Sequence, residues 1–160
     1  MADPQTTSEG VSIGPEPFGA PESQALDGAR QAEIIERYGW DSEPGVKPAE
    51  HDLAAFLVAR DPGGRAVGCG GLRPLGGGAV EIKRMYVSPA ARGAGLGRRL
   101  LSALESEARR LGFSVCRLET GDLQTEAIAL YESAGYRPVE CWGAYADSEI
   151  SRCYELDMER

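Results

Sequence analysis

The sequence lacks a long apolar run. No stretch of the 160 residues approaches the roughly 18 consecutive apolar residues that a helix needs to cross a bilayer. The N-terminus also lacks the basic stretch followed by an apolar stretch that is typical of a secretory signal. We therefore expect a protein without a membrane partner.

Positive charge is scarce as well. Seventeen lysines and arginines stand against 25 aspartates and glutamates, which gives a formal net charge of −8 and a pI near 4.8. Proteins that bind nucleic acid need a basic face, so we expect no nucleic-acid partner. The same acidic balance weakly favours a cationic small molecule, such as an amine.

Clustered metal ligands and paired cysteines are also missing. Cys69, Cys116, Cys141 and Cys153 are far apart and form no C-x-x-C pair. Because three of them lie in apolar or β-branched runs, we expect buried thiols in a reducing cytoplasm, without a metal or redox role. His51 is the single histidine, and no nucleophile or second ligand accompanies it. We expect no bound metal.

What the chain does have is the composition of an ordinary globular protein, with 42% hydrophobic and 26% charged residues. Its length suffices for one hydrophobic core. We expect a single domain over residues 1–160, with the polar residues 1–8 poorly ordered.

The hydrophobic patterns predict an α+β domain on a mixed central sheet of about six to seven strands, flanked by helices. Strands are expected within 10–21 (an edge strand) and at 52–60, 66–75, 79–87, 113–119, 136–139 and 150–158. Helices are expected at 22–38, between the glycine-rich segment and Gly112, and at 122–134; an irregular loop at 40–50 is expected over a binding cleft. The strands between 52 and 87 should form an antiparallel meander, and the next strand should pair parallel across a helix.

The most informative stretch follows the 79–87 strand and reads Arg92-Gly93-Ala94-Gly95-Leu96-Gly97-Arg98. The first turn of a helix has four backbone N–H groups without partners and the positive end of the helix dipole. Glycines let an anion approach those donors, so we predict a diphosphate cradle. The alternative is that these glycines serve only packing at the helix start. The segment matches neither a dinucleotide-binding turn nor a P-loop, because its glycines and the residues beside them are spaced differently from those motifs.

This segment resembles the acetyl-coenzyme A signature of the GNAT superfamily of N-acetyltransferases. That signature is Gln or Arg, two residues of any type, Gly, any residue, and Gly or Ala, and residues 92–97 match it. A second family pattern matches downstream at Ala127, Leu130, Tyr131, Gly135 and Tyr136. Gln124 stands where the family commonly has an asparagine. The resemblance covers roughly residues 52–139.

The resemblance implies that strands 79–87 and 113–119 splay apart and hold acetyl-coenzyme A between them. Backbone groups of Met85 and Val87 would then pair with the pantetheine arm, and the Val87 N–H would stabilise the oxyanion that develops on the acetyl carbonyl. The amides of 93–98 would hold the pyrophosphate. The cofactor-binding residues expected on this basis are Met85, Tyr86, Val87, Arg92, Gly93, Ala94, Gly95, Leu96, Gly97, Arg98 and Gln124.

The implied reaction is direct attack of a neutral primary amine on the thioester in a ternary complex. An amine with a pKa of about 10.4 is almost wholly protonated at neutral pH, so a general base is needed, and the leaving thiolate needs an acid. Glu81 is the candidate base by resemblance; the alternative is a surface glutamate paired with Lys83 or Arg84. Tyr131 is the candidate acid; the alternative is a tyrosine that only packs the helix.

The sequence leaves the acceptor unidentified. Aromatic or acidic residues that lie in the first-helix region and the late strands are candidates for binding it, or else fill the core or surface: Tyr38, Trp40, Glu140, Trp142, Tyr145, Asp147 and Glu149. Homodimers are common in the family the sequence resembles. Two alternatives to acetyl transfer stay open, a non-catalytic acyl-coenzyme A-binding module and an acyltransferase for a longer acyl chain.

Overall fold

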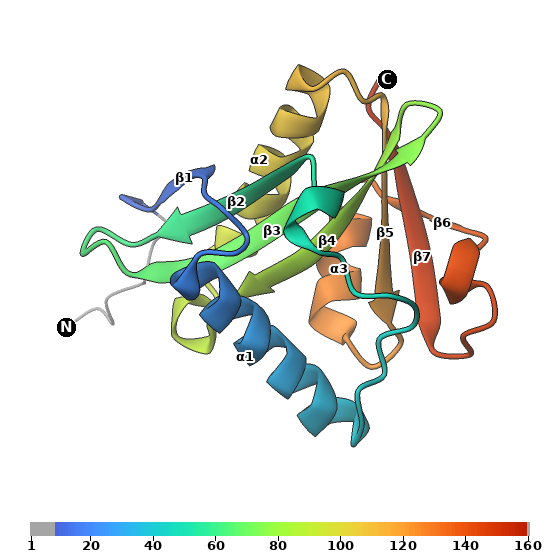
Figure 1. The fold of residues 1–160 in the computed structure, drawn as a ribbon, viewed down its shortest axis with the longest axis horizontal. Coiled ribbons are helices and arrows are strands. Elements are labelled where there is room, and N and C mark those ends of the chain that lie inside the picture. The colour runs from blue at the N-terminus through green and yellow to red at the C-terminus, as the bar shows by residue number, and fades with distance from the viewer. Residues whose placement is uncertain (1–8, 160) are drawn as a thin grey trace.

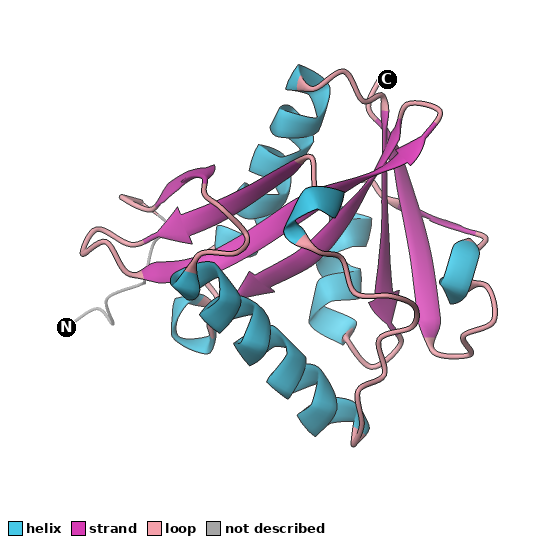
Figure 2. Ribbon diagram, viewed as in Figure 1, coloured by secondary structure: helices cyan, strands magenta, loops and turns pink. Residues whose placement is uncertain are grey.

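A computed structural model describes residues 9–159, which form a seven-stranded mixed sheet with helices on both faces (Figure 1, Figure 2). The strand order is β1-β2-β3-β4-β5-β7-β6. Helix α1 covers one face of the sheet, and α2 and α3 lie behind the other (Figure 1). The predicted α+β architecture is confirmed, whereas the expectation for residues 1–8 lies outside the described residues.

The elements follow the predicted order. The strands are β1 (Ser12–Pro15), β2 (Ala55–Arg60), β3 (Ala66–Gly76), β4 (Ala79–Val87), β5 (Val115–Gly121), β6 (Arg137–Val139) and β7 (Ser151–Asp157). The helices are α1 (Pro21–Tyr38), α2 (Leu96–Arg110) and α3 (Thr125–Ser133), with short 3₁₀ turns η1 (Glu50–Asp52), η2 (Pro89–Ala91) and η3 (Gly143–Tyr145). Boundaries differ from the predictions by up to three residues: β2 and α3 each begin three residues later than expected, and β5 begins and ends two residues later.

The apolar periodicity of α2 places its buried side chains against the sheet. Leu100, Leu101, Leu104 and Ala108 are at most 1% exposed and pack in one cluster with residues of β3, β4 and β5. This contact fixes the crossover from β4 to β5, which pair in parallel as predicted. On the opposite face, Leu26 of α1 packs in a second cluster with residues of β2 and β3.

The parallel pair separates in its second half, and this creates room for a site. β4 and β5 pair from Ala79↔Val115 to Ile82↔Leu118. Beyond Ile82, the register between β3 and β4 shifts, and Arg84 takes a positive φ of 62°. Such a bulge bends its strand and re-aims the side chains on it. The sequence patterns did not predict it, because a non-glycine residue with positive φ is uncommon.

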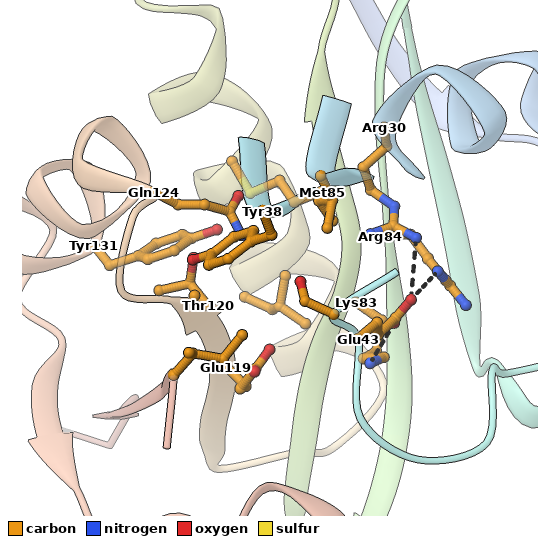
Figure 3. A pocket seen from close by; sticks show the side chains of 15 residues that line it. Arg30, Tyr38, Glu43, Lys83, Arg84, Met85, Glu119, Thr120, Gln124 and Tyr131 are labelled. Atoms are coloured by element: carbon orange, nitrogen blue, oxygen red, sulfur yellow. Dashed lines mark hydrogen bonds and ion pairs between the residues drawn. The ribbon is translucent and has the colours of Figure 1, made fainter. Parts of the chain in front are cut away.

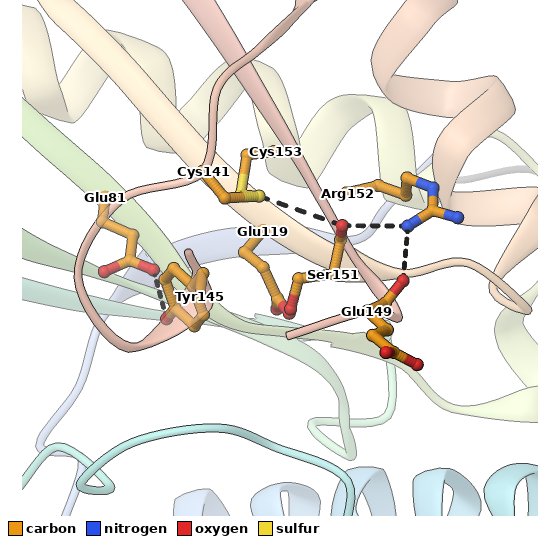
Figure 4. The surroundings of a disulfide bond; sticks show 8 residues. All are labelled: Glu81, Glu119, Cys141, Tyr145, Glu149, Ser151, Arg152 and Cys153. Atoms are coloured by element: carbon orange, nitrogen blue, oxygen red, sulfur yellow. Dashed lines mark hydrogen bonds between the residues drawn. A yellow bond between two sulfur atoms is a disulfide. The ribbon is translucent and has the colours of Figure 1, made fainter. Parts of the chain in front are cut away.

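Cys141 and Cys153 form a disulfide (Figure 4), so the expectation of four free thiols was wrong. The antiparallel pairing of β6 and β7 places Val139 opposite Cys153 and brings the two cysteine Cα atoms to 5.2 Å. Spacing along the chain could not reveal this proximity. Cys69 and Cys116 are the buried free thiols that were expected, and burial raises the pKa of each to about 12.

In the described part of the chain, none of the helices combines the length and the apolar character that crossing a membrane would require. The disulfide removes the cysteine-based reason for expecting a reducing compartment, so a cytoplasmic location stays a prediction.

Candidate functional site

Two adjoining pockets lie where β4 and β5 separate. The outer pocket, of about 410 Å³, is bounded by α1, the end of β4, the glycine loop and α3. The inner pocket, of about 80 Å³, is bounded by α1, Ser42 and Glu43, the middle of β4 and the end of β5 (Figure 3). The residues that line both pockets are Arg30, Ile34, Met85, Gln124 and Tyr131. The two pockets therefore form one continuous site.

Most of the residues predicted to bind a cofactor are brought together at the outer pocket. Those that line it are Met85, Tyr86, Val87, Arg92, Gly93, Gly95, Leu96, Gly97 and Gln124. Two predicted residues lie elsewhere. Ala94 lines a separate hollow beside β3, and the Arg98 guanidinium donates a hydrogen bond to the Ser133 hydroxyl at 3.0 Å.

The glycine loop leaves space at the start of α2. Gly93 and Gly95 have φ values of 84° and 80°, which strongly favour glycine, and a Cβ on either would meet no protein atom within 4 Å. Gly95 is the N-cap of α2 and no side chain caps the helix. Among residues 9–159, no acceptor is found for the backbone N–H groups from 93 to 98. The loop thus offers free donors at the positive end of a helix dipole, which fits a bound diphosphate.

The end of β4 offers a further free donor. The N–H of Ser88 donates to the Val67 carbonyl of β3 at 2.8 Å. Because backbone groups alternate along an antiparallel strand, the N–H and C=O of Val87 point away from β3, toward the gap beside β5. The Val87 carbonyl accepts a hydrogen bond from the Arg92 guanidinium at 2.9 Å. The Val87 N–H is left for a ligand because β5 pairs with β4 only as far as Ile82.

Tyr131 lies at the junction of the two pockets. Its side chain is 8% exposed, and its ring packs edge-on against Tyr136 with centroids 6.1 Å apart. Burial, with a smaller contribution from the Glu119 carboxylate, raises the pKa of Tyr131 to about 12. The hydroxyl therefore keeps its proton at neutral pH and can only donate it or share it in a hydrogen bond.

Glu81 is buried rather than at the surface, although the pair with Lys83 that the alternative expected is present, with the Lys83 ammonium 3.9 Å from Glu81 Oε2. It is 0% exposed, so it is not a surface residue, and it lines neither pocket of the described chain. Its Oε1 accepts from the Arg73 guanidinium at 2.7 Å, and its Oε2 accepts from the Tyr145 hydroxyl at 2.6 Å (Figure 4). Both carboxylate oxygens are therefore engaged by the protein.

A different carboxylate, Glu119, reaches the inner pocket from the end of β5 (Figure 3). It accepts a hydrogen bond from the Ser151 hydroxyl at 2.5 Å. Burial raises the pKa of Glu119 above the ordinary glutamate value, and the Ser151 hydrogen bond opposes that rise only in part. A carboxylate with a raised pKa is a stronger base, which is what proton removal from an amine requires.

The aromatic residues considered for the acceptor separate into distinct environments. Tyr38 lines the inner pocket and donates a hydrogen bond to Asp122 at 3.1 Å. Trp40 is 61% exposed. Trp142 packs edge-on against the buried Tyr145. The Tyr145 hydroxyl donates a hydrogen bond to Glu81 and accepts one from Lys83. Of these four rings, only Tyr38 lines the two-pocket site.

Sequence reasoning missed the contribution of α1 and of the inner pocket wall. From α1, Arg30, Ile34 and Arg37 face the outer pocket, and their helical spacing could have indicated one shared face. The loop at 40–50 was expected over a cleft, and its Ser42 and Glu43 do line the inner pocket. The role of α3 in both pockets follows from the motif that contains Tyr131.

Comparison with known proteins agrees with this geometry. The model of the acetyltransferase (GNAT) family matches residues 22–136. An IAA acetyltransferase of Azospirillum brasilense is 40% identical over 134 residues, which cover 79% of this chain and 87% of that protein. A Klebsiella pneumoniae structure, solved as a candidate acyl-CoA N-acyltransferase, is 32% identical with a TM-score of 0.82, over 95% of this chain and 99% of that chain.

A GNAT family acetyltransferase from Elizabethkingia anophelis, solved with acetyl-CoA bound, shares the fold at a TM-score of 0.70 and 18% identity, over 93% of this chain and 99% of that chain. The matched family segment, 22–136, includes α1, the glycine loop, α2 and α3, and thus all the helices that bound the two pockets. The chain belongs to the acetyltransferase (GNAT) family and is an acyltransferase.

Proposed function

We propose that this protein transfers the acetyl group of acetyl-coenzyme A to a primary amine by direct attack in a ternary complex. Acetyl-coenzyme A, the donor, occupies the outer pocket, and the amine enters the inner one. The observation that carries the proposal is that Met85, Gln124 and Tyr131 line both pockets, so a thioester among them is reachable from both sides. The acetyl-CoA held by the Elizabethkingia relative supports the choice of donor.

The donor would be held mainly by the backbone. The amides of 93–98 would bind the diphosphate, and the wall made by Met85 and Gln124 would hold the pantetheine arm. The Val87 N–H would donate to the acetyl carbonyl oxygen as negative charge develops there. The amides of 93–98 are available for this because no acceptor for them is found among residues 9–159.

Glu119 is the base that the geometry supports best. It lines the inner pocket, its pKa is raised by burial, and it can take a proton from the incoming ammonium directly or through a water molecule. Glu81 was the candidate from family resemblance, but Arg73 and Tyr145 engage both of its oxygens. We assign Glu81 the role of positioning Tyr145 and Lys83 beneath the inner pocket.

Tyr131 would assist the departure of the thiolate. A tyrosine with a pKa of about 12 is a weaker acid than a thiol, whose pKa is about 8.5, so full proton transfer to the sulfur is uphill. We therefore propose that the hydroxyl stabilises the developing thiolate by a hydrogen bond. Such charge-assisted bonds are roughly twice as strong as neutral ones.

Two measurements on the full chain test this function. Thermal unfolding with and without acetyl-coenzyme A tests the donor site, because a ligand at a hundred times its Kd stabilises the folded state by about 2.7 kcal/mol. Thiol release with a panel of primary amines then tests turnover. A thermal shift without amine-dependent thiol release would indicate a binding module, and no shift would mean that the glycines serve only the helix start.

A cytoplasmic location and a homodimer are further parts of the proposal. Sedimentation of the purified protein at several concentrations measures the second: a species of twice the 17.1 kDa chain mass is expected.

A further inference from the structure

The inner pocket carries a cluster of buried charge on its α1 and β4 wall. The Glu43 carboxylate accepts from Arg84 at 2.9 Å, lies 3.3 Å from the Lys83 ammonium, and lies 3.4 Å from the Arg30 guanidinium (Figure 3). Asp27 pairs with Arg30 at 2.9 Å and lies 3.6 Å from Arg84. Burial opposes ionisation of Glu43, yet the three cations together hold its pKa below the ordinary value.

The charges are separated between two walls of the pocket. Arg30, Lys83 and Arg84 contribute three positive charges, and Asp27 and Glu43 contribute two negative ones, so this wall by itself carries an excess of one positive charge. Glu81 pairs with Arg73 and lies 3.9 Å from Lys83, and these two residues, Glu81 and Arg73, add no net charge. The Glu119 carboxylate on the facing wall balances the excess across the pocket, so a ligand with a negative group at one end and a positive group at the other would complement both walls.

Arg84 marks where that negative group would bind. Its side chain is 2% exposed, and its Nε is a buried donor with no hydrogen-bond partner among the described residues. An unsatisfied buried donor costs roughly 1–3 kcal/mol and calls for an explanation. Arg84 also has the positive φ of 62° at the bulge of β4. Strained backbone of this kind clusters at ligand-binding sites.

The wall that faces these cations carries a carboxylate and a hydroxyl instead. Glu119, at the end of β5, and the Tyr131 hydroxyl face the inner pocket from the side where acetyl transfer is proposed (Figure 3). A ligand that spans the pocket would therefore meet a carboxylate base at one end and an arginine cluster at the other. The volume of about 80 Å³ restricts that ligand to a small molecule or a short terminal group.

We propose that the acceptor is a primary amine that carries a carboxylate, in the manner of a small free amino acid. Its carboxylate is bound by Arg84 and Arg30, and its amine lies toward Glu119 and the thioester. The inference rests on the proposed acetyl transfer and adds the class of its acceptor. It adds a carboxylate to the cationic amine that the net charge of −8 favoured, because the α1 and β4 wall of the pocket is positive although the whole chain is negative.

The wild-type protein provides the first test. Thiol release from acetyl-coenzyme A is measured with each common amino acid and with its carboxamide, which keeps the amine but removes the negative charge. We expect kcat/KM to be about 10- to 100-fold higher for the preferred amino acid than for its amide, the range for a hydrogen bond to a charged group. Amides that react as well as the acids would overturn the proposal.

Arg84→Met provides the second test, with Arg110→Met as the matched control because Arg110 lies at the exposed end of α2. We expect Arg84→Met to lower kcat/KM for the amino acid by at least tenfold while leaving the amide and the acetyl-coenzyme A thermal shift unchanged. Arg30→Met serves as a second variant should Arg84→Met fail to fold; because Arg30 also lines the outer pocket, its readout is the ratio of kcat/KM for the acid to that for the amide. An equal loss for acid and amide would contradict the proposal.

Binding in the absence of turnover separates this inference from the proposed function. Calorimetric titration of the same amino acids into protein saturated with coenzyme A reports the carboxylate site alone. Binding without thiol release would support the carboxylate site and refute the transferase reaction. Thiol release from neutral amines without amino-acid binding would do the reverse, and absence of both would overturn both.

Discussion

Gly95→Glu, compared with Gly112→Glu, tests the diphosphate cradle most directly. The two glycines flank α2: Gly95 is its N-cap, and Gly112 lies two residues past its last residue, Arg110. Both have positive φ, 80° and 92°, and an added Cβ would meet no protein atom within 4 Å at either position. The two variants therefore introduce the same side chain, the same charge and a similar backbone strain at opposite ends of one helix.

The expected magnitudes follow from this geometry. A non-glycine residue in the left-handed region costs about 1–2 kcal/mol, so both variants should lose a similar free energy of unfolding. Only Gly95 adjoins the free amides of the outer pocket. A carboxylate at about 5 Å from a phosphate charge, with an effective dielectric constant of about 20, is repelled by about 3 kcal/mol, which weakens binding by more than a hundredfold.

The assay is the thermal shift with increasing acetyl-coenzyme A, which yields an apparent Kd for each variant. Gly112→Glu should bind like the wild type from a lower starting melting temperature, whereas Gly95→Glu should show no shift at concentrations that saturate the wild type. If Gly95→Glu bound acetyl-coenzyme A within a few-fold of Gly112→Glu, the cradle would be refuted and the glycines would serve only the helix start.

Three further predictions concern the reaction and the fold. Tyr131→Phe should lower kcat roughly ten- to a thousandfold and leave the acetyl-coenzyme A thermal shift unchanged; loss of folding instead would support a packing role. Glu119→Gln should lower kcat by about a hundredfold. It should also remove the acidic limb of the pH–rate profile, which is expected above the ordinary glutamate pKa of about 4.3 because the base works only when deprotonated and burial raises its pKa. The control, Glu81→Gln, should lower the melting temperature and keep that limb. Cys141→Ser should cost about 2–3 kcal/mol of unfolding free energy for the 12-residue separation that the disulfide closes, and a reductant should reproduce the loss in the wild type; an unchanged melting temperature would show that the bond does not form in solution.

Local sequence determined much of the scaffold and of the outer pocket. The spacing of Leu100, Leu101 and Leu104 predicted α2 and its buried face, and the glycines from Gly93 to Gly97 predicted an anion site at its start. These features could be predicted because helical periodicity and unpaired amides at a helix start depend on residues close together in the chain. Tyr131 was found by the same route, through a motif contained within α3 and the turn after it.

The inner pocket was decided by tertiary structure. Arg84 faces α1 because a bulge bends β4 at that residue, and Glu43 and Glu119 reach the same space from a loop and a strand far apart in the sequence. The disulfide likewise depends on the register of β6 against β7. The sequence by itself thus predicted where the diphosphate of a donor could bind, because that part of the site is made by one loop and the start of one helix. Only the folded sheet decided which charges face the acceptor, because burial and the pairing of distant residues set those charges.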